Sequence, residues 1–241
     1  AYPINVKMMA GVEVRTPLVD HVIDLDAVAE AVTDRTKIIM LATPNNPTGT
    51  ALSTADLGQL LNKVPDDVIV LVDEAYREFS DPALGNPITD LMPTHRNVVV
   101  SRTFSKAYGL AGLRTGYVIT DPETVVELDK VLLALSSNSI AQAASVAVLD
   151  ALEENQPRID LLLSERQRLV DALVESGWEL PDAQANFVYI PMGDRTDEIC
   201  LGLEKRGVVT RPFAGDGLRV TIGSPEENDR FLRTLDEVVS H

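Results

Sequence analysis

The chain has 241 residues, of which 45% are hydrophobic and 24% charged, a composition typical of a folded protein. Its 37 acidic and 21 basic residues give a net charge of −16, which argues against nucleic acid as a partner, because binding to phosphate backbones depends on Lys and Arg. No apolar run approaches the roughly 20 residues of a membrane-spanning helix, so no membrane partner is expected. One cysteine and three dispersed histidines predict neither an internal disulfide nor a metal site, and the expected location is the reducing cytoplasm.

The first half of the chain alternates between short apolar runs and segments with helical spacing. The runs lack polar alternation, which is typical of strands in a sheet covered on both faces. This order predicts an α/β domain with a mostly parallel sheet flanked by helices. The predicted strands are 37–42, 68–72, 97–101 and 116–119, and the helices between them are 25–32 and 54–64, the second with Ser53 or Thr54 as its N-cap.

Beyond Pro122 the pattern changes to three helices followed by a β-α-β-β-α order. It predicts a smaller α+β domain at the C-terminal end, with a division inside or beside a long helix. We therefore expect a larger domain at 1–157, incomplete at its N-terminal side, and a smaller domain at 158–241. The predicted helices are 123–135, 140–153, 158–177, 196–206 and 226–239, and the strands are 186–190, 208–210 and 218–222.

Three of the predicted strands end in polar motifs. A turn at 44–49 (PNNPTG) follows the first, the acids Asp73 and Glu74 follow the second, and Thr103-Phe104-Ser105-Lys106 follows the third. The carboxyl ends of parallel strands form the edge at which α/β proteins bind ligands. Each motif alone also has an ordinary structural reading, as a tight turn, a helix N-cap or a surface loop. Asp73 and Glu74 should face opposite ways, and a buried acid there needs a cationic partner.

Two further cations suggest what such an edge would bind. Arg114 follows Lys106 by eight residues, and a guanidinium near two hydroxyls suits a phosphate group. A partly desolvated lysine amine can also condense with a carbonyl. Arg219 lies in an apolar run, where it needs either an internal acid or a ligand carboxylate. Pyridoxal phosphate is the cofactor whose chemistry uses a lysine, an acid at its ring nitrogen and a phosphate site together.

In this order, the motifs at 44–49, 73–76, 103–114 and 218–223 resemble the fold-type I aminotransferases, in the branch of the histidinol-phosphate and aromatic amino acid enzymes. The resemblance covers essentially the whole chain. It implies a seven-stranded, mostly parallel sheet that carries pyridoxal 5'-phosphate, a smaller C-terminal domain, and a homodimer with sites at the interface. It also implies that a segment before residue 1 supplies a glycine-rich phosphate loop, an aromatic ring stacked on the cofactor and a tyrosine that reaches the neighbouring subunit, so the chain is expected to be a fragment.

The resemblance also implies a role for each matching residue. Lys106 would form the imine and move the proton, Asp73 would hold the ring nitrogen, and Tyr76 would donate to the 3-oxygen of the cofactor. The other matching residues are Asn46, also at the 3-oxygen; Thr103, Ser105 and Arg114 at the phosphate; Arg219 at the substrate carboxylate; and Asn186 near it.

The choice of substrate rests on the loop 211–217 (RPFAGDG). Arg211 matches an arginine that meets the substrate phosphate in histidinol-phosphate enzymes, although it could equally be a solvated or structural arginine. The compact loop looks more like that of aromatic amino acid aminotransferases, so an aromatic amino acid and a 2-oxo acid are the expected substrates, with histidinol phosphate as the alternative. A C–S lyase or decarboxylase with the same cofactor, and a non-enzymatic regulator on the same fold, are the competing classes. A nicotinamide-binding protein is poorly supported, since Gly109-Leu110-Ala111-Gly112 is not a dinucleotide motif.

Overall fold

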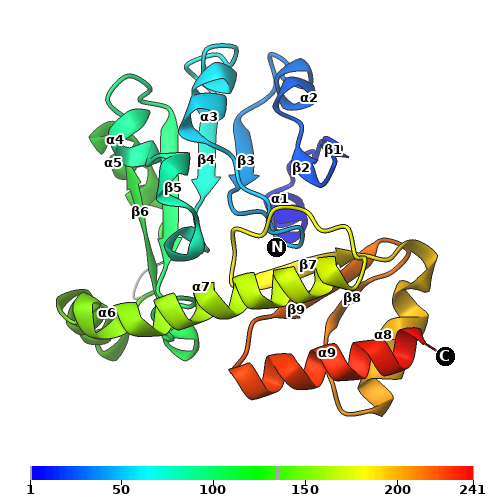
Figure 1. Ribbon diagram of the computed structural model, residues 1–241. Coiled ribbons are helices and arrows are strands. Elements are labelled where there is room, and N and C mark those ends of the chain that lie inside the picture. The colour runs from blue at the N-terminus through cyan, green and yellow to red at the C-terminus, as the bar shows by residue number, and fades with distance from the viewer. Residues whose placement is uncertain (1, 134–135, 241) are drawn as a thin grey trace.

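The larger sheet has four strands in the order β3-β4-β5-β6. The computed structural model describes residues 2–133 and 136–240 (Figure 1). β3 (Ile38–Ala42), β4 (Ile69–Asp73) and β5 (Val98–Thr103) are parallel, and β6 (Gly116–Thr120) is antiparallel to β5. The four predicted strands and the mostly parallel α/β sheet are thus confirmed.

Two helices cover the first strands of this sheet. α2 (Leu25–Glu30) and α3 (Thr54–Leu61) share a hydrophobic core with β3, β4 and β5. The Ser53 side chain caps α3 by accepting from the Asp56 N–H at 3.1 Å. α3 ends three residues before its predicted end, because Pro65 disfavours helical backbone just before it.

Three helices lead away from β6 towards the C-terminal part. These are α5 (Pro122–Val131), α6 (Ser139–Asp150) and α7 (Leu152–Glu175). The predicted helix 123–135 extends over residues 134–135, which lie outside the described residues. α7 begins six residues before its predicted start and includes Pro157 in its first turns. Figure 1 shows α7 running from below the larger sheet to the C-terminal sheet. It contacts β7 of the C-terminal sheet, and its Asn155 donates to the Ala107 carbonyl in the loop after β5.

The C-terminal sheet is antiparallel, in the order β7-β9-β8. It consists of β7 (Phe187–Pro191), β8 (Arg211–Phe213) and β9 (Gly217–Thr221). One face, which includes Val188 and Leu218, packs against α7, α8 (Thr196–Lys205) and α9 (Pro225–Val239). β8 lies three residues beyond the predicted strand 208–210, because the Val208 N–H bonds to the Leu203 carbonyl and ends α8 instead.

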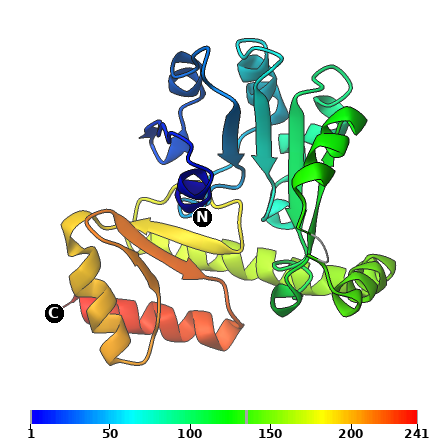
Figure 2. The same ribbon diagram turned by 180° about the vertical axis from the view of Figure 1, so that it is seen from behind.

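The first residues of the chain form a short helix, and several other short elements connect the main helices and strands. α1 (Tyr2–Met8) lies between the carboxyl ends of the larger sheet and the C-terminal sheet in both views (Figures 1 and 2). No helix among residues 2–133 and 136–240 is long and apolar enough to cross a membrane. The remaining elements are β1 (Leu18–Val19), β2 (Val22–Ile23), α4 (Pro87–Asp90) and four 3₁₀ helices, η1 (Arg77–Phe79), η2 (Pro82–Leu84), η3 (Ala111–Leu113) and η4 (Gly193–Arg195).

Candidate active site

Asp73 ends the central strand β4 and faces the space between the two sheets. Its Oδ1 accepts the Ala75 N–H at 3.1 Å, and its Oδ2 accepts the Tyr2 hydroxyl at 2.5 Å. Burial and the nearby Asp73 carboxylate raise the pKa of the Tyr2 phenol above its ordinary value, so Tyr2 remains a proton donor. Within the described part of the chain, Asp73 has no ion pair with Lys, Arg or His, which leaves its charge available to a ligand.

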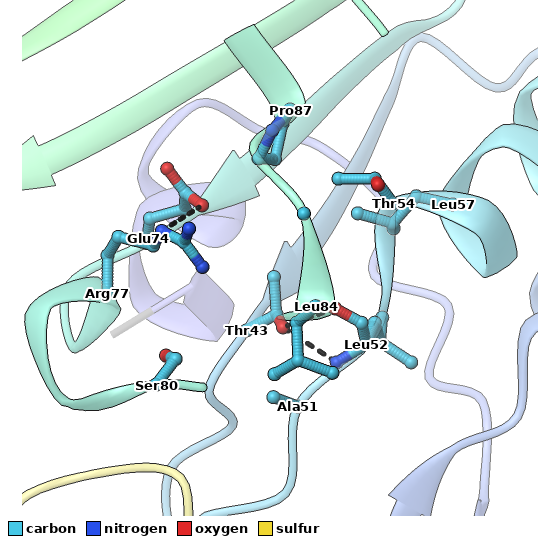
Figure 3. A pocket seen from close by; sticks show the side chains of 11 residues that line it. Thr43, Ala51, Leu52, Thr54, Leu57, Glu74, Arg77, Ser80, Leu84 and Pro87 are labelled. Carbon is cyan, nitrogen blue, oxygen red and sulfur yellow. Dashed lines mark hydrogen bonds and ion pairs between the residues drawn. The ribbon is translucent and has the colours of Figure 1, made fainter. Parts of the chain in front are cut away.

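Glu74 turns the other way, as the strand alternation predicted. Its side chain is 3% exposed and lies 2.7 Å from Arg102 Nη2, with Arg77 Nε at 3.8 Å. Figure 3 shows Glu74 and Arg77 pointing toward one another beside a cavity of about 10 Å³, room for about one water. The predicted cationic partner of a buried acid is therefore Arg102, and Glu74 is structural.

A chain of contacts joins four of the predicted site residues. Lys106 Nζ lies 5.3 Å from the centre of the Tyr76 ring. The Asn46 amide lies 3.5 Å from the Tyr76 hydroxyl, and Arg219 Nη1 donates to Asn46 Oδ1 at 2.6 Å. The structure thus brings together residues from the ends of β3, β4 and β5 and from β9.

The predicted phosphate ligands lie where β5 and β6 meet. The Thr103 hydroxyl donates to the Thr115 carbonyl at 3.3 Å and accepts the Ser105 N–H at 3.1 Å. Arg114 has left-handed backbone, with φ 54°, and its exposed guanidinium donates to the Ala111 carbonyl at 2.9 Å. One guanidinium nitrogen is therefore used to shape the loop, and Arg114 has further donors for an anion.

Arg219 has the environment of a ligand-binding arginine. Its guanidinium lies 5.0 Å from the centre of the Phe187 ring, and its Nε is buried with no hydrogen-bond partner in the described residues. It forms no ion pair with any described acid. Arg211 on β8 is its direct cross-strand neighbour, and like charges in that position destabilise a sheet unless an anion lies between them.

Asn186 has no hydrogen bond that ties its side chain to the candidate site in the described ranges, and Tyr2 is a site residue that the sequence did not predict. The Asn186 carbonyl accepts the Ile222 N–H, but no hydrogen bond joins its side chain to the other predicted site residues within the described ranges. Tyr2 had no sequence signal, since a single tyrosine near the start of the chain follows no motif. Its contact with Asp73 is visible only once α1 is placed beside β4.

Comparisons of the sequence with known proteins all match aminotransferases. The family profile of class I and II aminotransferases matches residues 1–235. An aromatic amino acid aminotransferase of Rhodococcus opacus is 50% identical over 233 residues, 96% of this chain and 64% of that protein. An aromatic amino acid aminotransferase of Mycobacteroides abscessus is 46% identical over 232 residues, 96% of this chain and 67% of that protein.

A comparison with solved structures also matches an aminotransferase. A crystal structure of histidinol-phosphate aminotransferase from Sinorhizobium meliloti, in complex with pyridoxal 5'-phosphate, superposes with a TM-score of 0.91 at 28% identity. The match covers 99% of this chain and 67% of that one. The chain thus spans about two thirds of the length of the relatives it matches.

Proposed function

This chain belongs to the class I and II aminotransferases, and from that premise we propose that it exchanges an amino group between an aromatic amino acid and a 2-oxo acid, with pyridoxal 5'-phosphate as its cofactor. The observation that supports this best is the line of contacts from Lys106 through Tyr76 and Asn46 to Arg219. It places an amine, two polar side chains suited to a phenolic oxygen and a carboxylate-binding cation around one space.

The residues present fit the cofactor. Asp73 accepts two hydrogen bonds but has no cationic partner among the described residues, so its charge suits the protonated ring nitrogen. The buried Nε of Arg219 has no acceptor in the same part of the chain, which suits a ligand carboxylate. Tyr76 and Asn46 would bind the 3-oxygen. Thr103, Ser105 and Arg114 would hold the phosphate.

Each side chain then has a definite task. The cofactor, when bound, supplies an aldehyde and an electron-accepting ring. Asp73 keeps the proton on the ring nitrogen, because a carboxylate stabilises the positive charge there. Arg219 binds the substrate carboxylate and so fixes the orientation of the Cα–H bond. Lys106 acts as the general base that removes the proton from Cα.

The proposed preference for an aromatic substrate rests on the relatives, and Arg211 on β8 bears on the alternative. Two of the relatives are named aromatic amino acid aminotransferases, which supports an aromatic substrate. The direct pairing of Arg211 with Arg219 favours a second candidate, histidinol phosphate, because an additional anion would relieve the repulsion of the two cations.

The same proposal includes a homodimer and a cytoplasmic location. Exposed apolar side chains on α5 and α6, among them Val126 and Val146, support an interface between copies. The separate hydrophobic clusters of the larger sheet and of the C-terminal sheet, the second of which includes Leu169 and Leu173 of α7, support a division into the domains 1–157 and 158–241.

A half-reaction tests the activity. The protein is loaded with pyridoxal 5'-phosphate, and phenylalanine or histidinol phosphate is added without a 2-oxo acid. Phenylalanine should convert the aldehyde absorbance to that of the aminated cofactor, and Lys106→Ala should abolish the change. Conversion by histidinol phosphate alone would favour the second candidate. Release of CO₂ from phenylalanine without amination would instead show a decarboxylase, and release of pyruvate and ammonia from cysteine, added as a separate substrate, would show a C–S lyase.

A further inference from the structure

Arg166 on α7 joins two segments that both contribute to the candidate active site. Its Nη1 donates to the Phe79 carbonyl at 2.8 Å and to the Ala185 carbonyl at 2.9 Å. Phe79 belongs to η1, and Ala185 lies two residues before the start of β7. A single nitrogen atom therefore bridges the η1 turn and the segment that leads into β7.

The environment of Arg166 is unusual for an arginine. It is half-buried and forms no ion pair with the described acids, so its partners are two neutral carbonyls. Burial lowers the pKa of its guanidinium below the ordinary value, and the more distant Asp182 opposes this only in part. The two charge-assisted hydrogen bonds offset some of the cost of desolvation.

The two carbonyls lead directly to residues of the site. The Phe79 N–H bonds to the Tyr76 carbonyl, so this end of the bridge fixes the turn that carries Tyr76. At the other end, Ala185 is two residues before Phe187, whose ring supports the Arg219 guanidinium. The Phe187 ring also meets the Tyr76 ring edge-on, at 5.1 Å between centroids.

Two further hydrogen bonds hold the segment before β7, both of them through Gln184. The Gln184 N–H donates to the Gly49 carbonyl at 2.8 Å, and Gln184 Oε1 accepts the Asp81 N–H at 2.8 Å. Residues 184–187 are thus tied to the segments that follow β3 and β4. The hydrogen bonds from Arg166 tie Ala185 to the η1 turn, where Ile159 also packs with Phe79 and Ala185. Loss of Arg166 would leave Ala185 without this bond while Gln184 remains anchored.

We propose that Arg166 is a positioning residue that fixes Arg219 relative to Tyr76, and thereby sets the affinity of the site for the substrate carboxylate. The inference rests on the proposed function, in which Arg219 binds that carboxylate. Loss of Arg166 should therefore weaken the binding of the carboxylate group alone, because the other groups of the ligand are not bound by Arg219. Binding of a carboxylate should weaken, and binding of the matching neutral compound should not.

Two ligands that cannot be transaminated separate these effects. The dissociation constants of 3-phenylpropanoate and 3-phenylpropan-1-ol are measured by calorimetry on the protein loaded with pyridoxal 5'-phosphate. In Arg166→Leu, the preference for the carboxylate should fall about tenfold, the scale of coupling between residues in one hydrogen-bond network, while the alcohol binds as in the wild type. Arg166→Lys, which keeps the cation on a shorter chain, should lose part of this preference.

A neighbour on the same helix provides the control. Arg168 pairs with Glu165 and Asp229 at 2.7 Å, away from the site, so Arg168→Leu should lower thermal stability and leave the carboxylate preference unchanged. In the double variant Arg166→Leu/Arg219→Leu, the carboxylate should bind no more weakly than in Arg219→Leu alone.

The inference would be overturned by equal weakening of both ligands in Arg166→Leu, by additive losses in the double variant, or by a wild-type preference in Arg166→Lys. A different result would overturn the proposed function: a wild-type protein that does not prefer the carboxylate, or an Arg219→Leu variant that keeps the preference.

Discussion

Replacing Arg102 by leucine should lower the free energy of unfolding by about 3–5 kcal/mol, the usual cost of leaving one partner of a buried ion pair without the other. Glu74 is 3% exposed and accepts from Arg102 Nε at 2.8 Å and Nη2 at 2.7 Å. After the substitution, Arg77 is the cation that remains near Glu74 among the described residues, and its Nε is 3.8 Å away, which is too far for a hydrogen bond.

Thermal unfolding measures the effect. For a chain of this size, the loss corresponds to a decrease in Tm of roughly 6–20 °C. Arg96→Leu is the matched control, because Arg96 also donates through Nε and Nη2 to one carboxylate, that of Asp121 at 2.9 Å, but is 66% exposed. Its removal should change Tm far less. The double variant Arg102→Leu/Glu74→Gln should recover much of the stability, since a neutral amide is less costly to bury. Equal shifts for Arg102→Leu and Arg96→Leu would refute the reasoning.

Three further substitutions test the site and its surroundings. Asp73→Asn should leave binding of pyridoxal 5'-phosphate measurable but slow transamination by about 100-fold or more, and a near-normal rate would remove Asp73 from its role. Tyr2→Phe frees Asp73 Oδ2 and should tighten cofactor binding about tenfold in a fluorescence titration, whereas unchanged affinity would show that the Tyr2 hydroxyl does not compete. Burial raises the pKa of Glu78 above 4.5, so its contribution to stability is full below pH 4.5 and is lost as the pH rises through the higher folded value. Glu78→Gln should therefore be more stable than the wild type at pH 7, with a gain that shrinks toward pH 4 in urea titrations; a gain independent of pH would contradict this.

The sequence was sufficient for the larger sheet and most of the candidate site because both depend on local patterns. Continuous apolar runs can be buried only as covered strands, and parallel strands bring their carboxyl ends to one edge. Asn46, Asp73 and Lys106 all follow such strands. Their proximity in space could therefore be predicted without knowing any contact.

Other features depend on contacts between distant segments and carry no local signal. Residues 208–210 look like a strand, but the partner β9 determines where β8 lies, through the tight turn at Gly215 with φ 71°. The sequence pattern predicted a helix only from residue 158, whereas α7 begins at Leu152 and continues through Pro157, which has no N–H to bond back to the Glu153 carbonyl. The contacts of Tyr2 with Asp73 and of Arg166 with Ala185 join residues far apart in the sequence, so neither spacing nor composition indicates them.

Reduction of the cofactor-loaded protein with borohydride, followed by proteolysis and mass mapping, tests the central assignment most directly. Because the Lys106 amine lies over the Tyr76 ring in the candidate site, the reduced cofactor should be found on the peptide that contains Lys106, and Lys106→Ala should incorporate none. Attachment to any other lysine, or no covalent attachment at all, would contradict the account.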